Sequence, residues 1–513
     1  MFAKLHSLGV TALDGYVVTV EVDVSGGLPQ FAIVGLPDNA VKEATDRVRS
    51  ALKNLGFSYP ASRITVNLAP ADTRKTGPVY DLPLLLGLLV AGEQIQPIAP
   101  DCAFIGELSL NGNVRPVSGV LPMALACRQA GINKLFVPQA NAQEAALVEN
   151  LQVYPLNTAK DAILHLAGQQ PLAPAPKTNI SLQEVAGLIP DLRDVRGQLE
   201  ARRALEIAAA GLHNILMVGA PGSGKSMLAK RLPGILPPLT YAEAIETSKI
   251  YSVAGLLQKQ GNSGGLVTTR PFRSPHHSVS PAGLAGGGSQ PKPGEISLAN
   301  NGVLFLDELP EFIRESLEVL RQPLEDGVVT VSRVAGTVSF PSRFMLVAAM
   351  NPCPCGYFGH PTRECRCNMA AIDRYLQKVS GPLLDRIDLH VEVQPVEYDD
   401  ISATQGGEES AAVLQRVLTA RAFAAGRAGQ RPLVPNAALV GERLRQDCAL
   451  TPRAATTLKT AFQRLGLSAR GYDRMLRVSR TIADLDGAEV IDAQHVAEAV
   501  QYRNLDRKYW HYR

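Results

Sequence analysis

The sequence lacks the features that place a chain in a membrane or mark it for secretion. Its longest apolar run, from Leu82 to Gly92, is far shorter than the ~20 residues that span a bilayer. The opening stretch, MFAKLHSLGVTALDGYVV, has one early lysine and no sustained apolar segment, so it predicts neither a secretory signal nor an anchor. We therefore expect a cytoplasmic protein with no membrane partner.

The chain also lacks a dominant sign of charge and the composition of a disordered protein. With 51 basic and 48 acidic residues, its net charge of +3 is too small to indicate a nucleic-acid partner, so any such surface must be a local patch. Hydrophobic residues make up 46% and charged residues 19%, which is typical of a chain that packs throughout. A chain of 513 residues is too long to fold around one hydrophobic core, so about three domains of ~150 residues are expected.

Cysteine is scarce outside one short segment. Three of the seven cysteines are scattered, at Cys102, Cys127 and Cys448. The other four form C-x-C followed by C-x-C with nine residues between, at Cys353, Cys355, Cys365 and Cys367. In a reducing compartment this cluster favours a structural Zn²⁺ site, with free thiols or a redox pair as alternatives, and His360 could replace one ligand.

The pattern along the chain predicts several domains. Residues 1–168 mix alternating strand patterns, such as Tyr16 to Val24, with helical periodicity, such as Val41 to Leu52. A proline-rich linker follows over 169–186. Buried strand patterns and a glycine-rich loop then predict a doubly wound α/β core over 187–395, and residues 396–513 predict a helical lid.

A phosphate-binding loop follows the strand predicted from Asn214 to Val218. The motif G-x-x-x-x-G-K-[ST] is matched by Gly219, Ala220, Pro221, Gly222, Ser223, Gly224, Lys225 and Ser226. Its backbone N–H groups and the start of the next helix suit phosphate oxygens, Lys225 reaches the β- and γ-phosphates of ATP, and Ser226 ligates Mg²⁺. A chance glycine-rich turn is the alternative.

Two acids and an asparagine complete the predicted ATP site. Val303 to Leu306 is a continuous apolar strand, expected to neighbour the strand of the glycine-rich loop, and it ends in Asp307 and Glu308. Asp307 can hold the Mg²⁺ shell and Glu308 can polarise the attacking water, unless both merely cap the strand. Asn351, at the end of a further buried strand, can bond the γ-phosphate or the water, with a turn-forming role before Pro352 as the alternative.

Two arginines are candidates for sensing the γ-phosphate. Arg386 lies just before a strand-like segment and could act as an arginine finger in a neighbouring subunit, or pair within the chain with Asp385 or Asp388. Near the C-terminus one predicted helix face is lined with arginine, which a solvated face also explains. Arg470 is the first choice there for the sensor arginine of an AAA-type lid, with Arg474 and Arg477 as alternates.

Long stretches of the chain resemble one known family. GAPGSGKS, GEISLANNGVLFLDELPEF, NPCPCGYFG, SGPLLDRIDLHVEV and TRPFRSPHHSVSPAGLAGGG are similar to magnesium-chelatase-like AAA+ proteins of the YifB/ComM type. This resemblance implies an AAA+ P-loop domain with a helical lid, preceded by a Lon-protease-like α+β domain. It also implies a hexameric ring in which Arg386 acts in trans. The implied activity is that of a DNA helicase that drives branch migration while incoming single strands are recombined during natural transformation, with single-stranded or branched DNA as its partner.

The same resemblance implies two elements in a central pore. The segment from Phe272 to His277 would be an insert in the second helix, and Val328 to Phe340 would be a β-hairpin. Alternating β-branched residues independently favour the hairpin. Arg333, Arg273 and His276 are then candidate contacts to the DNA backbone, although a solvated arginine in an ordinary turn is the competing explanation.

The N-terminal region resembles the proteolytic domain of Lon proteases, but without its chemistry. In NLAPADTRKTGPVYDLP, Val79 stands at the position of the nucleophilic serine. No lysine occurs between Arg115 and Lys134, where the resemblance places the base. We expect an inactive scaffold, which argues against an ATP-dependent protease. The remaining alternative to a DNA translocase is a chelatase-type ATPase that remodels a protein partner.

Overall fold

The computed structural model describes residues 1–177, 189–257, 265–288, 291–333, 336–395 and 407–510. It contains two compact units, and each is made from more than one segment of the chain. The first comprises Met1–Ser181 and Tyr241–Thr268, and the second comprises Leu182–Thr240 and Thr269–Arg513. No described helix is both long enough and apolar enough to cross a membrane.

The first unit is built on a mixed seven-stranded sheet. Its strand order is β3-β4-β2-β1-β5-β8-β9, with antiparallel pairing of β1 with β2 and of β2 with β4, and parallel pairing elsewhere. The strands are β1 (Phe2–Thr11), β2 (Asp14–Ser25), β3 (Gln30–Val34), β4 (Arg63–Ala69), β5 (Cys102–Phe104), β8 (Lys134–Pro138) and β9 (Gln152–Leu156). A small separate ribbon pairs β6 (Glu107–Leu108) with β7 (Val114–Arg115).

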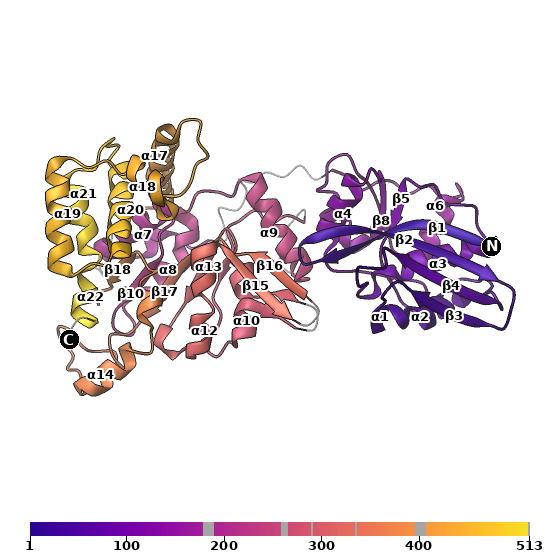
Figure 1. The fold of residues 1–513 in the computed structure, drawn as a ribbon, viewed down its shortest axis with the longest axis horizontal. Helices are drawn as coiled ribbons and strands as arrows, with labels where there is room; N and C mark the ends of the chain where they lie inside the picture. Colours follow the sequence, from indigo (N-terminus) through magenta and orange to yellow (C-terminus); the bar gives the residue numbers. More distant parts are fainter. Residues whose placement is uncertain (178–188, 258–264, 289–290, 334–335, 396–406, 511–513) are drawn as a thin grey trace. The chain divides into compact units, whose positions relative to one another are not determined.

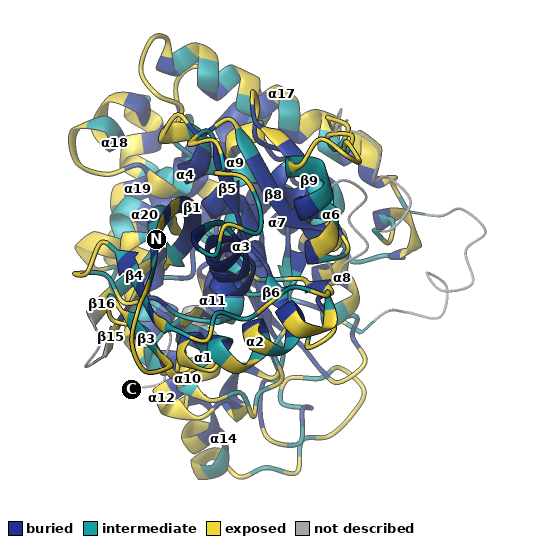
Figure 2. Ribbon diagram, turned by 90° about the vertical axis from the view of Figure 1, so that its right-hand side faces the viewer, coloured by how far each residue is buried: buried dark blue, intermediate teal, exposed yellow. Residues whose placement is uncertain are grey.

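The first unit also contains helices, of which the most apolar is the most deeply buried. They are α1 (Asn39–Lys42), α2 (Ala44–Asn54), α3 (Asp81–Ala91), α4 (Val120–Gln129), α5 (Ala142–Ala145), α6 (Ala159–Leu166) and α9 (Tyr241–Val253). The longest apolar run of the sequence is α3, which packs on β1 and β2 and is buried along almost its whole length (Figure 2). It is therefore a core helix of the first unit, consistent with its short length.

Helix α9 belongs to the first unit although its sequence lies between two elements of the second. It packs against α4, and the Gly119 N–H donates to the Ser252 carbonyl at 3.0 Å. The buried carboxylate of Glu144 accepts from the Leu121 N–H at 2.9 Å, and the Ser252 hydroxyl donates to the same carboxylate. Helix α9, which the sequence analysis assigns to the ATPase core, thus packs within the first unit.

The second unit is built on a parallel five-stranded sheet in the order β11-β14-β17-β10-β18. Its strands are β11 (Phe272–Arg273), β14 (Val303–Leu306), β17 (Met345–Met350), β10 (Ile215–Val218) and β18 (Leu389–Glu392). The prediction that the acidic strand neighbours the strand of the glycine-rich loop is wrong, because β17 pairs with both and separates them. Asn351, which follows β17, consequently lies between the two predicted halves of the ATP site.

Helices surround this sheet and form the C-terminal region (Figure 1). They are α7 (Leu199–Gly211), α8 (Lys225–Arg231), α10 (Pro281–Ala285), α11 (Glu295–Leu298), α12 (Arg314–Glu318), α13 (Arg321–Asp326), α14 (Met369–Leu376), α15 (Gly381–Leu384), α17 (Ser410–Ala428), α18 (Gly441–Asp447), α19 (Pro452–Leu465), α20 (Ala469–Leu485), α21 (Ala493–Gln501) and α22 (Asn504–Tyr509). One hydrophobic cluster joins the sheet to these C-terminal helices through residues such as Val347, Leu389, Val417 and Ile482. The predicted α/β core with a helical C-terminal region is confirmed.

The predicted hairpin is confirmed, and the predicted helix insert is not. β15 (Val328–Arg333) and β16 (Gly336–Pro341) pair antiparallel, although residues 334–335 at the turn lie outside the described residues. The start of the Phe272 to His277 segment is instead the edge strand β11, which pairs in parallel with β14. The insert was expected from the resemblance alone, and no helical periodicity in this segment supported it.

Candidate nucleotide-binding site

The glycine-rich loop joins β10 to α8 at the carboxyl edge of the parallel sheet. Gly224 precedes α8 with φ of 95°, a left-handed conformation that glycine adopts without strain. The Ser223 hydroxyl is buried and has no hydrogen-bond partner among the described residues. A buried polar atom without a partner at the start of a helix fits a ligand with phosphate oxygens.

Lys225 is held by the loop that precedes it. Its Nζ donates to the carbonyls of Gly219 at 2.8 Å and Ala220 at 2.9 Å, and to Asn351 Oδ1 at 3.2 Å. Burial lowers the pKa of Lys225 to about 8, against the opposing influence of Asp307 and Glu308. A phosphate group there would supply the compensating negative charge that this buried ammonium lacks.

The two acids behave differently although they are adjacent. Asp307 Oδ2 accepts from the Ser226 hydroxyl at 2.6 Å, which brings the two predicted Mg²⁺ ligands into contact across α8 and β14. Glu308 has φ of 54°, a left-handed conformation that is unfavourable for a residue with a side chain. Its carboxylate is 55% exposed, so it faces solvent where a water molecule can approach.

Sequence reasoning missed a contact made by Glu308. His277 Nδ1 lies 3.4 Å from Glu308 Oε2, and the His277 ring lies 4.0 Å from the ring of His276. His277 follows the edge strand β11, which pairs with the strand preceding Glu308. This contact depends on the parallel pairing of β11 with β14, which the sequence analysis did not predict.

Arg386 is paired within the chain, but with an acid other than the two predicted from sequence. Its guanidinium donates to Glu325, which lies in the last turn of α13 in a distant part of the sequence, and to the Pro382 carbonyl at 2.5 Å. Asp385 lies 3.5 Å from Arg474, and Asp388 lies 3.0 Å from His213. Arg386 can act on another subunit only after releasing Glu325.

The four arginines of α20 have different surroundings. Arg470 lies exposed in the first turn, and Arg477 is half-buried. Arg480 is fully buried and is used structurally, since it pairs with Asp484 at 3.0 Å and donates to the Glu489 carbonyl at 2.8 Å. Arg474 is buried, and burial lowers its pKa. Its Nη2 lies in a long ion pair, 3.5 Å from Asp385 Oδ1, and its Nη1 has no hydrogen bond among the described residues.

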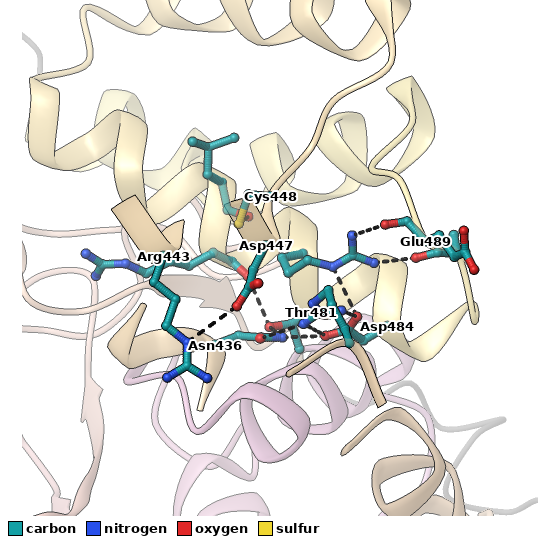
Figure 3. A network of polar contacts seen from close by, with 12 residues as sticks. Asn436, Arg443, Asp447, Cys448, Thr481, Asp484 and Glu489 are labelled. Atoms are coloured by element: carbon teal, nitrogen blue, oxygen red, sulfur yellow. Dashed lines mark hydrogen bonds and ion pairs between the residues drawn. The ribbon is translucent and has the colours of Figure 1, made fainter. Parts of the chain in front are cut away.

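A buried polar chain joins the helical region to the sheet. His213, which precedes β10, lies 2.7 Å from the Thr481 hydroxyl of α20 and 3.0 Å from Asp388, next to β18. Asn436 Nδ2 donates to Thr481 at 3.1 Å and to Asp484 at 2.7 Å (Figure 3). A buried polar group without partners destabilises the fold, so this network of hydrogen bonds fixes α20 against the strands of the candidate site.

The four clustered thiols come together in the loop after Asn351. Cys353 Sγ lies 3.4 Å from Cys355 Sγ and 3.7 Å from Cys365 Sγ, and the Sγ atoms of all four cysteines lie within 4.8 Å of one another. His360 is not part of this group. Its Nδ1 accepts from the N–H groups of Thr362 and Arg363, which excludes that atom as a metal ligand.

The candidate DNA contacts are only partly described. Arg273 is engaged in a two-point ion pair with Glu295, with both N···O distances 2.7 Å. His276 is exposed, and its Nδ1 lies 2.8 Å from the Ser278 hydroxyl. Arg333 ends β15, but its side chain lies outside the described residues.

The loop of the first unit that resembles a protease site is filled with apolar and structural groups. Val79 is 5% exposed and lies in a short 3₁₀ turn, Pro78–Tyr80. The first turn of α4, where a catalytic lysine would be expected, instead has its backbone N–H groups bonded to Ser252 and Glu144. Lys75 is fully buried and donates to the Thr73 carbonyl at 2.7 Å.

Comparison with known families covers most of the chain. The profile described as magnesium chelatase, subunit ChlI, matches residues 191–401. Subunit ChlI of Mg-chelatase matches residues 20–141, and the C-terminal part of magnesium chelatase subunit ChlI matches residues 407–503.

Two relatives of similar length match nearly the whole chain, and a longer one matches part of it. The chain is 47% identical over 509 residues to "Competence protein ComM" of Haemophilus influenzae, covering 98% of each protein. It is 44% identical to "Uncharacterized protein YifB" of Escherichia coli, covering 98% of this chain and 97% of that one. A "Lon protease" of Acinetobacter baumannii is 31% identical over 189 residues, which is 34% of this chain and 23% of that protease.

Proposed function

Because the chain belongs to the magnesium-chelatase-like YifB/ComM family of AAA+ ATPases, we propose that it is a DNA translocase that migrates branched recombination intermediates during natural transformation. The name of the Haemophilus influenzae relative supports the link to competence. We propose a hexameric ring in the cytoplasm, with single-stranded or branched DNA in its pore. The observation that carries the ATPase part is the contact network of Lys225, Ser226, Asp307 and Asn351 at one sheet edge.

Each residue of this edge has a defined task in the proposal. ATP with Mg²⁺ supplies the phosphoryl group that is transferred to water. The loop from Gly219 to Ser226 binds the phosphates, Ser226 and Asp307 provide oxygen ligands for the metal, and Glu308 orients the water and accepts its proton. Asn351 positions the γ-phosphate in this proposal, and its hydrogen bond with Lys225 supports that task.

Two arginines would complete the site. Arg386 would reach the ATP of the neighbouring subunit once Glu325 releases it. Arg470 remains the first candidate for the sensor of the helical region, but the buried and incompletely bonded guanidinium of Arg474 supports that alternate. Arg333, Arg273 and His276 stay proposed DNA contacts, and for Arg273 this requires release from Glu295.

We also propose that the four thiols bind a structural Zn²⁺. Tetrahedral zinc with Zn–S bonds of about 2.3 Å separates its sulfur ligands by about 3.8 Å. The Sγ atoms of Cys353, Cys355 and Cys365 lie 3.4, 3.6 and 3.7 Å apart in pairs, which is near that spacing, and all four Sγ atoms lie within 4.8 Å of one another. Zinc analysis of protein purified without chelator should find one ion per chain, and absence of stoichiometric metal would refute the site.

The function is tested by comparing wild type with Lys225→Ala and Glu308→Gln in ATP turnover assays, with and without branched DNA. Wild-type turnover should rise with DNA. Lys225→Ala should lose nucleotide binding, whereas Glu308→Gln should bind nucleotide without hydrolysing it. If DNA neither binds nor changes turnover, the matches to magnesium chelatase subunits favour a chelatase-type ATPase that remodels a protein.

A further inference from the structure

The loop that carries the four thiols lies directly against the phosphate-binding loop. A Cβ atom placed on Gly356 would lie 2.4 Å from Cδ and 2.6 Å from Cγ of Pro221, so the backbone of Gly356 touches the proline ring. The same thiol loop begins at Asn351, which accepts from Lys225. The thiol loop therefore contacts the phosphate-binding loop at two points, one on Pro221 and one on Lys225.

The thiol loop has no regular secondary structure. Residues 351–368 contain no helix or strand. Its internal backbone hydrogen bonds are short-range turns, from Gly356 N to Cys353 O and from His360 N to Tyr357 O. Irregular loops of this length are uncommon in compact domains unless they are functional or cross-linked. The thiols bring the two ends of the loop together, since Cys353 and Cys365 are 3.7 Å apart at sulfur.

We propose that metal binding by Cys353, Cys355, Cys365 and Cys367 controls the affinity of the phosphate-binding loop for ATP, by holding Gly356 against Pro221. The inference rests on the proposed ATP and Zn²⁺ sites. With metal bound, the thiol loop braces Pro221 and keeps Asn351 beside Lys225. Without metal, the loop samples other shapes and only a fraction of molecules retain the competent phosphate-binding loop.

The first experiment measures the Kd of a fluorescent nonhydrolysable ATP analogue on zinc-loaded protein. The same protein is then treated with a zinc-selective chelator while Mg²⁺ is kept in excess. The Kd should rise about tenfold, as expected if about a tenth of metal-free molecules are competent, and should recover when Zn²⁺ is added back. An unchanged Kd after complete zinc removal would overturn the proposal, as would protein that never contained metal.

A matched pair of variants tests the contact without removing a thiol. Gly356 and Gly359 belong to the same loop and have φ of 84° and 75°, so alanine is strained at both. Only at Gly356 would the new methyl meet the Pro221 ring, because at Gly359 it meets the flexible end of Lys508 at 3.7 Å. Gly356→Ala should weaken analogue binding with its zinc content unchanged, whereas Gly359→Ala should bind like wild type.

The outcomes separate this inference from the proposed function. If zinc-loaded wild type does not bind the analogue at all, the ATP site itself is misassigned. If wild type binds it and the two glycine variants bind equally well, the brace between Gly356 and Pro221 is refuted while the ATPase stands. Thermal unfolding of both variants, measured with zinc bound, shows whether a weakened affinity reflects general unfolding.

Discussion

The loop before α8 and the loop before α3 have similar places in their units but carry different side chains. Both follow a strand of a sheet and lead into a helix packed on that sheet, although β10 is buried throughout and β4 only at alternate positions. In the second unit, Lys225 and Ser226 still meet polar partners from separate strands. In the first unit, the buried Val79 stands at the position of the protease serine. A residue of α9 accepts a hydrogen bond from the backbone at the start of α4. A fold persists through its core, while chemistry depends on a few polar side chains that can be lost separately.

The largest expected effect is a loss of ATP turnover when Arg386 is replaced. Arg386→Ala should lower ATP turnover by about 10³-fold or more while nucleotide binding is retained, because an arginine finger stabilises transition-state charge. ATP turnover of the purified protein and analogue binding measure the two properties. Activity recovered by mixing Arg386→Ala with Glu308→Gln subunits would show that the arginine acts across an interface.

Glu325→Ala is the matched control for Arg386. It breaks the same ion pair but leaves the guanidinium in place. If Glu325→Ala loses as much turnover as Arg386→Ala, the pair has a structural role and Arg386 is not a finger.

The second prediction concerns the surface of the first unit that α9 covers. Glu144→Ala should destabilise the folded chain by about 2–3 kcal/mol, since the Leu121 N–H and the Ser252 hydroxyl lose a buried acceptor. Urea or thermal unfolding measures the loss. The exposed Glu149→Ala on the same segment should change stability little, and equal effects from both variants would argue against the docking of α9.

Local sequence patterns predicted the elements well, and long-range pairing explains what they missed. Val303–Leu306 is a strand with the predicted bounds, and the glycine-rich loop lies between the predicted strand and helix, because apolar runs and glycine act locally. The position of β17 between β10 and β14 and the membership of α9 in the first unit depend on contacts between distant segments. The pairing of Arg386 with Glu325 is of the same kind, since 61 residues separate them.

A smaller effect is expected at the contact between His277 and Glu308. An exposed ion pair stabilises one side-chain position by at most about 1 kcal/mol, so His277→Ala should raise basal ATP turnover by up to about fivefold by freeing the carboxylate. Turnover is measured without DNA, with His276→Ala as the control on the neighbouring exposed ring. A fall in turnover, or the same rise in both variants, would mean that His277 does not restrain Glu308.

The smallest expected effect lies in the first unit. Val79→Ser restores the hydroxyl that the resemblance to Lon proteases places there, yet no peptidase activity should appear. A serine needs a base to take its proton, and the first turn of α4 offers backbone N–H groups already bonded to Ser252 and Glu144. The change should only destabilise the first unit by about 1 kcal/mol, because an apolar side chain is replaced by a buried hydroxyl. Hydrolysis of a fluorogenic peptide by Val79→Ser, but not by Val79→Ala, would show that the first unit retains a base that the structure does not reveal.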